Sequence, residues 1–477
     1  MNSPRAAPPP DARTRIAIDL GAESCRVSLL RWHGGEPIIE FVHRIPNRPI
    51  HQDQSLRWPL ARILSGLEEG LRRAAERVPE GIASIAVDGW AVDYVRLGPD
   101  GTPVADPFCY RDERTVAAKA RADAIVSPES LFAIAGAQPL RINTLYQLLA
   151  DADSGVALTA PWLCLPESVL HWLGAPRVAE YTNATHTGLV SLATGAWSET
   201  LFQQFGIPLS TAPTIVPAGT ILGPLRGPLA SLSAFREAIL IAPACHDTAS
   251  AIAAISTPLD HVAYVSCGTW SLVGTRVPAA IATHEAHAAR FTNQGAAGGG
   301  FLFHANVNGL WMLKQCMDAW SESGRSWALD DLLGAAASLP TPARLLNVDA
   351  DSLFREGEMP QRINTELAAR GVEPIPDARG LEPVFVRLIL ESLAARYAEV
   401  LGDLRRITGR TFARIHVVGG GSRNKLLLDI TARRTGLPVE AGDAESSTLG
   451  NFAVQLAAHN GPLTLESLRM QAERLRR

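Results

Sequence analysis

Three short segments of the chain combine residue types that suit phosphate chemistry: residues 19–26, residues 245–251 around Asp247, and residues 266–272 around Thr269. The first and third segments each place small and hydroxyl residues between two apolar runs, which predicts a β-hairpin. Backbone N–H groups and hydroxyls at the tip of such a hairpin suit an anion. An acid between two such tips predicts a phosphotransferase in which two half-domains close on a nucleotide.

Asp247 follows an apolar run and precedes an Ala-rich stretch that predicts a helix to about Ile255. A carboxylate in this place suits a general base, because it can accept the proton of a substrate hydroxyl while that oxygen attacks a γ-phosphate. Its neighbours His246 and Thr248 would then hold adjacent sugar hydroxyls. The alternative is that Asp247 or Thr248 caps the helix and has no part in catalysis. This segment by itself does not decide between the two.

Asp19 lies at the end of a predicted buried strand, where an unpaired charge is costly. A carboxylate near phosphate suits a Mg²⁺ ion, often through water, and this is the role we favour. The alternative is an ion pair with Arg26 across the hairpin. We expect the loop to face the β- and γ-phosphates with five residues: Ala22, Glu23, Ser24, Cys25 and Arg26. Glu23 fits this loop only if its side chain turns to solvent, because an acid repels phosphate.

On the other side of Asp247, Thr269 is the expected hydroxyl donor to phosphate. Further along, residues 419–421 are three glycines between a predicted strand and a predicted helix, so the backbone there can approach a base or ribose. A dinucleotide-binding fingerprint is weak there because position 424 is Asn. A Walker-A loop is excluded, since none of the lysines follows a glycine. Phosphoryl transfer must therefore use the hairpin loops.

At 477 residues the chain is too long for one ordinary core, so two large domains are expected. Predicted hairpins open both halves, which is a weak internal duplication. We place the boundary after a predicted helix end. Residues 13–256 then form an N-terminal lobe with the sugar site and the first phosphate loop, and residues 257–477 form a C-terminal, nucleotide-binding lobe. Residues 1–12 are expected to be a disordered tail.

The composition is that of a globular protein, with 47% hydrophobic and 19% charged residues. A net charge of −4 without a basic block argues against a nucleic-acid partner. No uncharged apolar run reaches the roughly 20 residues that span a bilayer, so no membrane partner is expected. The six cysteines form no C-x-x-C pair, which favours a reducing compartment, and we expect a cytoplasmic protein.

The ordered set of these segments resembles the FGGY carbohydrate kinases, a family of the actin-like ATPase superfamily. The resemblance runs from Arg15 to about Leu456. It is carried by residues 19–22, 245–251, 266–272 and 418–421, with support from residues 143–148, 181–185 and 447–451. It implies an α/β fold of two actin-like, ribonuclease H-like lobes with an interlobe cleft.

The resemblance also implies an activity and a set of ligand contacts. Asp247 would accept the proton, and ATP with Mg²⁺ would phosphorylate a ketose to its 1-phosphate, with L-rhamnulose as the substrate of the branch that this chain most resembles. ATP would bind along residues 22–26 and at Thr269, Lys314 and Gly420. The sugar would be held by Ala91, His246, Asp247, Thr248 and Asn306.

This chain departs from the family pattern at three places near the ligands. Ala91 stands where the family has Gly, and the phosphate loop reads Ala-Glu-Ser-Cys-Arg rather than Ala-Ser-Ser-Gly-Arg. Lys314 stands where the family has Gln, which here follows as Gln315. Two alternatives stay open, namely a kinase of the same build for another ketose such as L-fuculose, and a non-catalytic sugar or nucleotide sensor. The expected partners are the sugar and ATP, and the oligomeric state stays open, a monomer included.

Overall fold

A computed structural model describes residues 12–476, and within them lie two six-stranded mixed sheets. The predicted tail lies outside the described residues apart from Ala12. The first sheet has the strand order β11 (Thr220–Pro224), β12 (Ile239–Ala242), β6 (Ile82–Gly89), β1 (Thr14–Leu20), β2 (Ser24–His33) and β3 (Glu36–Pro46). The second has the order β15 (Phe291–Gly295), β16 (Phe301–Asn308), β14 (Trp270–Val277), β13 (Val262–Cys267), β17 (Arg414–Val418) and β18 (Val439–Ala441). Short ladders join β4 (Ile50–Gln52) to β5 (Ser55–Arg57), β7 (Tyr94–Arg96) to β8 (Trp162–Cys164), and β9 (Val178–Glu180) to β10 (Thr214–Val216).

Both sheets are built on a hairpin that pairs with a later parallel strand. β1 is antiparallel to β2 and parallel to β6, and β13 is antiparallel to β14 and parallel to β17. Every residue of β1 is buried, as expected for a central strand that is covered on both faces. The two hairpin turns therefore occupy corresponding positions in their sheets.

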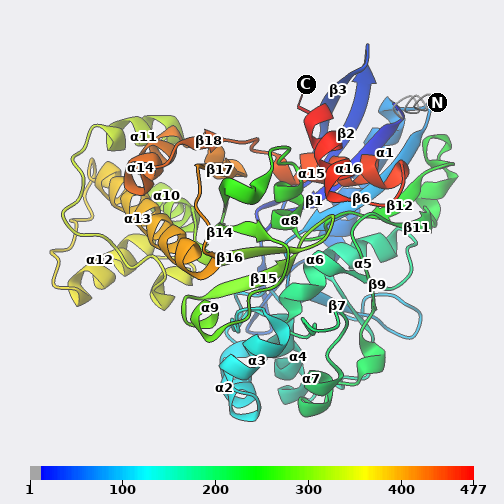
Figure 1. Cartoon of the computed structure of the whole chain (residues 1–477), viewed down its shortest axis with the longest axis horizontal. Helices are drawn as coiled ribbons and strands as arrows, with labels where there is room; N and C mark the ends of the chain where they lie inside the picture. The colour runs from blue at the N-terminus through cyan, green and yellow to red at the C-terminus, as the bar shows by residue number, and fades with distance from the viewer. Residues whose placement is uncertain (1–11, 477) are drawn as a thin grey trace.

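Two helices, α8 (Asp247–Ala253) and α15 (Ser446–His459), pack against each other between the sheets, as Figure 1 shows. A side chain at Gly450 would place its Cβ 1.7 Å from the backbone oxygen of Ser250, so this close crossing requires glycine. The apolar residues of both helices join one core cluster with residues of β1 and β13. This shared cluster connects the two sheets.

Other helices cover the outer faces of the sheets. α1 (Leu60–Arg77) packs on β2 and β3 with a stripe of apolar residues at helical spacing, and α13 (Glu382–Thr408) packs on β14 and β16. Further helices of the first half are α2 (Thr115–Ile125), α3 (Pro128–Ala135), α4 (Thr144–Asp153), α5 (Leu165–Trp172), α6 (Tyr181–Ala184) and α7 (Glu199–Gln204). Those of the second half are α9 (His284–Ala288), α10 (Trp311–Glu322), α11 (Leu329–Ala337), α12 (Met359–Ala369), α14 (Lys425–Thr435) and α16 (Leu465–Arg474).

The C-terminal helices belong to both halves of the molecule. The chain passes from the first sheet to the second between α8 and β13, but α15 then packs on β1 and β6, and α16 packs on α15 and α8. The last segment of the chain therefore completes the core of the first sheet as well as that of the second.

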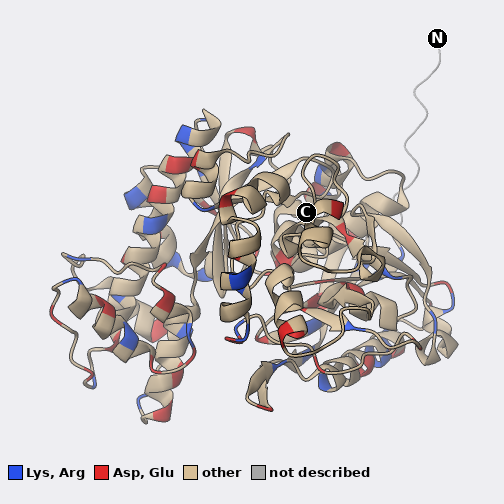
Figure 2. Cartoon of the chain, turned by 90° about the horizontal axis from the view of Figure 1, so that it is seen from below, with Lys and Arg blue, Asp and Glu red and all other residues tan. Residues whose placement is uncertain are grey.

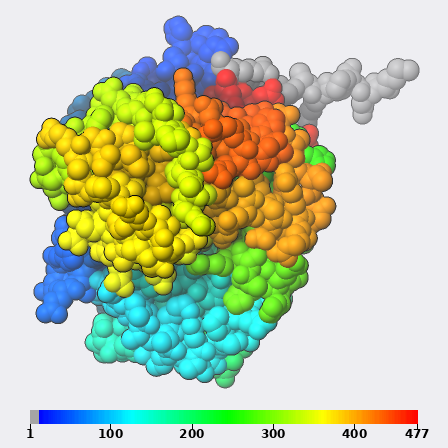
Figure 3. Space-filling view, turned by 90° about the vertical axis from the view of Figure 1, so that its left-hand side faces the viewer, coloured from blue at the N-terminus to red at the C-terminus, as the bar shows by residue number. Residues whose placement is uncertain are grey.

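The space-filling view shows one side on which the two halves meet. In Figure 3 the yellow residues of the second half lie above the cyan residues of the first. One contact between the halves is the hydrogen bond that Arg111 donates to the backbone oxygen of Phe354 at 3.1 Å. In the view of Figure 2, acidic and basic residues are interspersed. Of the helices in residues 12–476, none is long and apolar enough to cross a membrane.

Candidate active site

The carboxyl ends of strands in the first sheet bring three acids together. Asp19 and Asp88 are register partners on the parallel strands β1 and β6. Gly89, next to Asp88, bridges His246, and Asp247 follows directly. Asp247 also contributes electrostatically at both Asp19 and Asp88, so the three carboxylates face one region.

Asp247 is the first residue of α8 and does not cap this helix. The N-cap position is held by His246, whose side chain makes no capping hydrogen bond, so Asp247 is not the N-cap residue. The hydroxyl of Thr248 lies 3.3 Å from that of Ser266 on β13, which places the segment at the junction with the second sheet. The Asp247 side chain is 40% exposed, yet the surrounding protein desolvates its carboxylate and raises its pKa to about 6. Asp247 is thus ionised at neutral pH and is a stronger base than a surface aspartate.

His246 is held in one orientation by a residue of the second sheet. The side-chain amide of Gln294 on β15 donates to Nδ1 of His246 at 2.6 Å. This leaves the proton on Nε2, which lies 3.3 Å from Oδ1 of Asp247. Burial lowers the pKa of His246 to about 3, so the ring is neutral. His246 can therefore offer one hydrogen bond to Asp247 or to a sugar hydroxyl.

Asp19 forms the ion pair across the hairpin and still keeps an oxygen for another ligand. Its Oδ2 lies 3.1 Å from Arg26 and accepts a hydrogen bond from Ser447 at 2.8 Å. Within residues 12–476, Oδ1 of Asp19 has no hydrogen-bond partner. Oδ2 of Asp88 accepts from Asn451 at 2.6 Å, whereas its buried Oδ1 has no partner in the same described region.

These orphaned oxygens fit a divalent cation. Burial raises the pKa of Asp19 against the lowering effect of Arg26, and burial with repulsion from Asp19 raises the pKa of Asp88 well above its ordinary range. A Mg²⁺ ion would relieve both effects, because carboxylate oxygens are its usual protein ligands. In residues 12–476 no three His, Cys, Asp or Glu side chains form a metal cage. Phosphate and water oxygens would have to complete the coordination shell.

One polar stripe of α15 holds the two carboxylates, and it was not among the residues that we predicted to act at the site. Ser447 donates to Asp19, Asn451 donates to Asp88, and Gln455 donates to Asn451 at 2.7 Å. The three residues are spaced by four along a helix that is otherwise rich in apolar residues. Polar side chains at this spacing on a buried helix indicate a shared partner, and that signal was available in the sequence.

The tip of the first hairpin is braced from outside the hairpin. The N–H of Gly21 donates to the backbone oxygen of Ser24 at 3.2 Å. Asn47 donates from its side chain to the Gly21 oxygen at 3.0 Å and from its backbone to the Glu23 oxygen at 2.9 Å. Glu23 itself is exposed, which is the orientation that a phosphate-binding tip requires of it.

Cys25 is the loop residue whose side chain is buried in the core and not turned toward the expected phosphates. β2 begins at Ser24, and its alternation directs Cys25 and Val27 to the core, while Ser24 and Arg26 stay partly exposed. Burial raises the pKa of the Cys25 thiol to about 12. The thiol therefore does not face a phosphate, and Ala22, Ser24 and Arg26 remain as the half-buried residues of the loop.

The second hairpin tip is built from small residues that pack closely. Thr269 is half-buried in the turn, and a Cβ on Gly309 would lie 2.5 Å from its backbone oxygen. A Cβ on Gly421 would lie 2.2 Å from the sulfur of Cys267, whereas one on Gly420 would meet open space. Of these glycines, Gly420 is thus the one that can face a ligand.

Lys314 and Gln315 on α10 have separate surroundings. The Lys314 ammonium lies 2.8 Å from Oδ2 of Asp318 and is partly exposed. Gln315 is buried, and its side-chain oxygen accepts from the N–H of Gly357 at 2.9 Å. Of the two side chains, only that of Lys314 is on an accessible face of the helix.

The loop after β6 is strained and carries the predicted sugar contact at Ala91. Val92 has φ of 71°, a conformation that is unfavourable for a β-branched residue. Two residues of α4 stabilise it: the Val92 oxygen accepts from the Thr144 hydroxyl at 2.7 Å and from the Gln147 amide at 3.2 Å. Strain held in this way is typical of a functional loop.

Asp93 anchors the same loop to the buried core of the first lobe. Its Oδ2 accepts from the indole N–H groups of Trp58 at 2.6 Å and of Trp90 at 2.9 Å. The two tryptophan rings pack at 4.5 Å between centroids, and Trp90 is buried in the core. Burial raises the pKa of Asp93 to about 6 despite these hydrogen bonds.

Asn306 lies on β16, on the face that looks toward the histidines of the site. Alternate residues of a strand share a face, so Asn306 shares one with His304. The ring of His304 stacks with that of His186 at 6.2 Å, and His186 packs against His246 at 4.2 Å. The half-buried Asn306 therefore borders the same region as His246.

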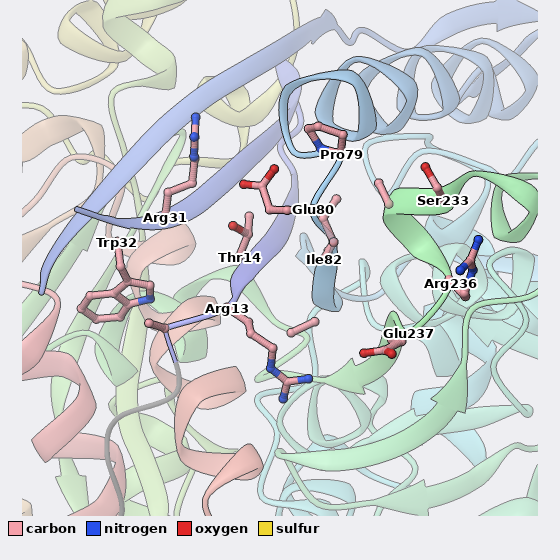
Figure 4. Close-up of a pocket in the computed structure, with 14 residues that line it drawn as sticks. Arg13, Thr14, Arg31, Trp32, Pro79, Glu80, Ile82, Ser233, Arg236 and Glu237 are labelled. Carbon is pink, nitrogen blue, oxygen red and sulfur yellow. The ribbon is translucent and has the colours of Figure 1, made fainter. Parts of the chain in front are cut away.

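A hollow of about 690 Å³ lies at the opposite end of the first sheet. Figure 4 shows Arg13, Thr14 and Glu80 among its lining residues. Thr14 begins β1 and Asp19 lies near its other end. The five steps along β1 from Thr14 to Asp19 span roughly 16 Å at about 3.3 Å per residue. The hollow is therefore far from the carboxylates and is not part of the site.

Comparison with known proteins agrees with this arrangement. The chain matches the N-terminal domain of the FGGY family of carbohydrate kinases over residues 14–254 and the C-terminal domain over residues 263–459. It is 34% identical to the rhamnulokinase of Bacteroides thetaiotaomicron over 92% of this chain and 90% of that protein. It is also 34% identical to the rhamnulokinase of Pectobacterium carotovorum over 95% of this chain and 90% of that protein.

Solved structures share the fold at lower sequence identity. The gluconate kinase of Lactobacillus acidophilus superposes with a TM-score of 0.76 at 17% identity, over 96% of this chain and 91% of that one. The glycerol kinase of Plasmodium falciparum, solved with ADP, gives a TM-score of 0.72 at 14% identity, over 97% and 92% of the two chains. The predicted α/β fold of two actin-like lobes is confirmed. Because both family domains match in order and cover most of its length, the chain belongs to the FGGY family of carbohydrate kinases.

Proposed function

We propose that this enzyme transfers the γ-phosphate of ATP to the 1-hydroxyl of L-rhamnulose and so yields L-rhamnulose 1-phosphate and ADP. The choice of sugar rests on the relatives that are named rhamnulokinases, at 34% identity over more than nine-tenths of this chain. The chemistry rests on one observation. Asp247 is a partly exposed carboxylate of raised pKa at the junction of the two hairpin tips.

In the proposed mechanism Asp247 accepts the proton of O1 as that oxygen bonds to the γ-phosphorus. The bond from the γ-phosphorus to the bridging oxygen breaks in line, and ADP leaves without a phospho-enzyme. His246 offers its Nε2 proton beside the base and orients the sugar with Thr248. Arg26 and the N–H groups at the first tip hold the charge of the transferred group.

We also propose which residues hold the metal, the nucleotide and the sugar. Asp19, with Asp88 beside it, would hold Mg²⁺, which neutralises phosphate charge when bound. Thr269, Lys314 and Gly420 would contact ATP. Ala91 and Asn306 would contact the sugar.

The test is a coupled assay of ADP release over a panel of L-rhamnulose, L-fuculose, xylulose, gluconate and glycerol. We expect the highest kcat/KM with L-rhamnulose and little ATP turnover without sugar. A higher value with L-fuculose would move the substrate to that ketose, which is a fair rival because Ala91 adds a methyl group to the sugar loop. If no sugar in the panel raises the rate of ATP turnover, the proposed kinase activity is wrong and a sugar or nucleotide sensor is favoured.

We further propose that the enzyme works in the cytoplasm. All six cysteines are free and buried, which suits a reducing compartment where disulfides do not form.

A further inference from the structure

Two carboxyl groups that the proposed mechanism does not use lie behind the segment that carries Asp247. Glu180 ends β9 and Glu167 lies on α5, and both side chains are buried. Burial raises the pKa of Glu180 to about 8 and that of Glu167 to about 7. Acids are rarely buried away from a charge partner, so each must serve its hydrogen-bond donors.

Glu180 reaches the peptide just before the catalytic segment. Its Oε2 accepts from the backbone N–H of Cys245 at 2.8 Å. On the other side of this residue, the Cys245 oxygen accepts from the N–H of Gly89 at 2.9 Å. Cys245 is thus fixed on one side by Glu180 and on the other by the end of β6, where the sugar loop begins. His246 and Asp247 follow it directly.

Each oxygen of Glu180 accepts from a backbone N–H, a donor that cannot turn into an acceptor. Besides Cys245, the backbone N–H of Thr182 donates to Oε1 at 3.0 Å. The hydroxyl of Thr182 lies 2.5 Å from Oε2. A side chain at position 180 must therefore present two acceptor oxygens, and only a carboxyl group of this length provides them.

We propose that Glu180 is a positioning residue for Asp247. It fixes the peptide of Cys245, and through it the direction in which the Asp247 carboxylate meets the sugar hydroxyl. This inference rests on the proposed function, in which Asp247 is the base. A displacement of about 1 Å at a reacting group can cost about 100-fold in rate, so a distant hydrogen bond can matter to catalysis.

Glu167 provides a matched control. It is also a buried acid, but whereas one of its oxygens accepts from a backbone N–H, the other accepts from a side-chain amide that can rotate. Its Oε1 accepts from the N–H of Glu180 at 3.0 Å, and its Oε2 accepts from the side-chain amide of Asn183 at 2.8 Å. The buried Oδ1 of Asn183 has no partner among residues 12–476. In Glu167→Gln, Asn183 can turn its amide and accept from the new NH₂ group. In Glu180→Gln, the NH₂ group must face a backbone N–H in either orientation.

The experiment compares wild type, Glu180→Gln and Glu167→Gln in steady-state kinetics with ATP and L-rhamnulose. For Glu180→Gln we expect kcat to fall about 10- to 100-fold, with KM for ATP within about threefold of wild type. For Glu167→Gln we expect kcat within about threefold of wild type. Thermal melting and ATP binding by calorimetry establish that each variant is folded at the assay temperature.

A second pair covers the case in which Glu180→Gln does not fold. Thr182→Val keeps Glu180 but removes a hydroxyl that donates to Oε2 of Glu180 and accepts from the N–H of His246 at 3.5 Å, so we expect kcat to fall about 3- to 10-fold with KM for ATP unchanged. Its control is Thr187→Val, since the Thr187 hydroxyl donates to the Ala184 oxygen and accepts from the N–H of Leu189, and neither contact reaches Glu180 or the catalytic segment. Here kcat should stay at the wild-type value.

Two results would overturn the positioning role. One is a kcat of Glu180→Gln that equals that of Glu167→Gln, and the other is a loss of ATP affinity as large as the loss of kcat. A wild-type enzyme without sugar-dependent ATP turnover is a different outcome, because it overturns the proposed function itself.

Discussion

The hairpins β1–β2 and β13–β14 occupy corresponding places in the two sheets but carry different side chains. The penultimate residue is Asp19 in β1 and Ser266 in β13. Their partners on the neighbouring parallel strands are Asp88 and Val418. One backbone frame thus holds a pair of carboxylates in the first lobe and a hydroxyl beside an apolar residue in the second.

This difference indicates how the two lobes divide their work. The first lobe gathers charge, and α15 holds its two carboxylates in place with the half-buried hydroxyl of Ser447 and the buried amide of Asn451. The second lobe presents a turn hydroxyl, an open glycine and one partly exposed lysine. Changes at the catalytic carboxylate of the first lobe should therefore affect the chemical step, and changes in the second lobe should affect nucleotide affinity.

The largest expected effect is that of Asp247→Asn. Asparagine keeps the shape of the side chain but cannot accept the proton, and a general base contributes about 10²- to 10⁴-fold to a rate. We expect kcat to fall about 1,000-fold, while calorimetry gives a Kd for ATP within about twofold of wild type. A kcat within tenfold of wild type would remove the base assignment.

The next largest expected effect is the pH dependence of the rate, which follows from the raised pKa of Asp247. Its pKa is raised to about 6, so the base is ionised above that pH and protonated below it. We expect kcat/KM for the sugar to be level near neutral pH and to fall about tenfold for each pH unit below about 6. An aspartate with the ordinary pKa of 3.8 would keep the activity constant to below pH 5. A kcat/KM that stays constant down to pH 5 would contradict the raised pKa of Asp247 and the desolvation that causes it.

Thr269→Val tests the second lobe. The substitution keeps the volume and removes a hydroxyl that would donate to a phosphate, a bond worth about 1.5–3 kcal/mol. We expect KM for ATP to rise about 10- to 100-fold with a much smaller change in kcat. The control is Thr275→Val on β14, where the hydroxyl donates to backbone oxygens of Leu259 and Val262. That variant should melt at a lower temperature and bind ATP normally.

Local patterns predicted the elements of the fold and the point at which they meet. Apolar runs around small residues predicted both hairpins, and the glycines at residues 419–421 lie after a strand as expected. The placement of Cys25 was open to the same reasoning, because the alternation of β2 directs it inward with Val27. Treating residues 22–26 as one loop concealed that pattern.

The spacing of the polar residues on α15 was visible in the sequence, but the identity of their partners was beyond such patterns. Ser447 binds Asp19 across 428 positions of the chain, and Gln294 of the second lobe orients His246 of the first. Pairs so distant in sequence are set by the packing of α15 between the sheets, not by local propensity. The strained backbone of Val92 was equally hidden, because a β-branched residue is the last that its conformation would suggest.

The smallest expected effect concerns Glu23, an exposed acid at the phosphate-binding tip. Glu23→Gln removes a negative charge near the expected phosphates, and at low salt we expect KM for ATP to fall about twofold. The gain should disappear at high ionic strength, since screening shortens the range of such a charge to a few ångströms. The control is Glu36→Gln, an exposed acid that begins β3 and pairs with His33 at the far end of the ten-residue strand β2. At about 3.3 Å a residue that charge lies roughly 30 Å from the tip, about three screening lengths at 0.1 M salt, so at that salt concentration KM should not change. An equal gain from both variants would trace the effect to net charge and not to the place of Glu23, and the first tip would then lose its role in holding phosphate.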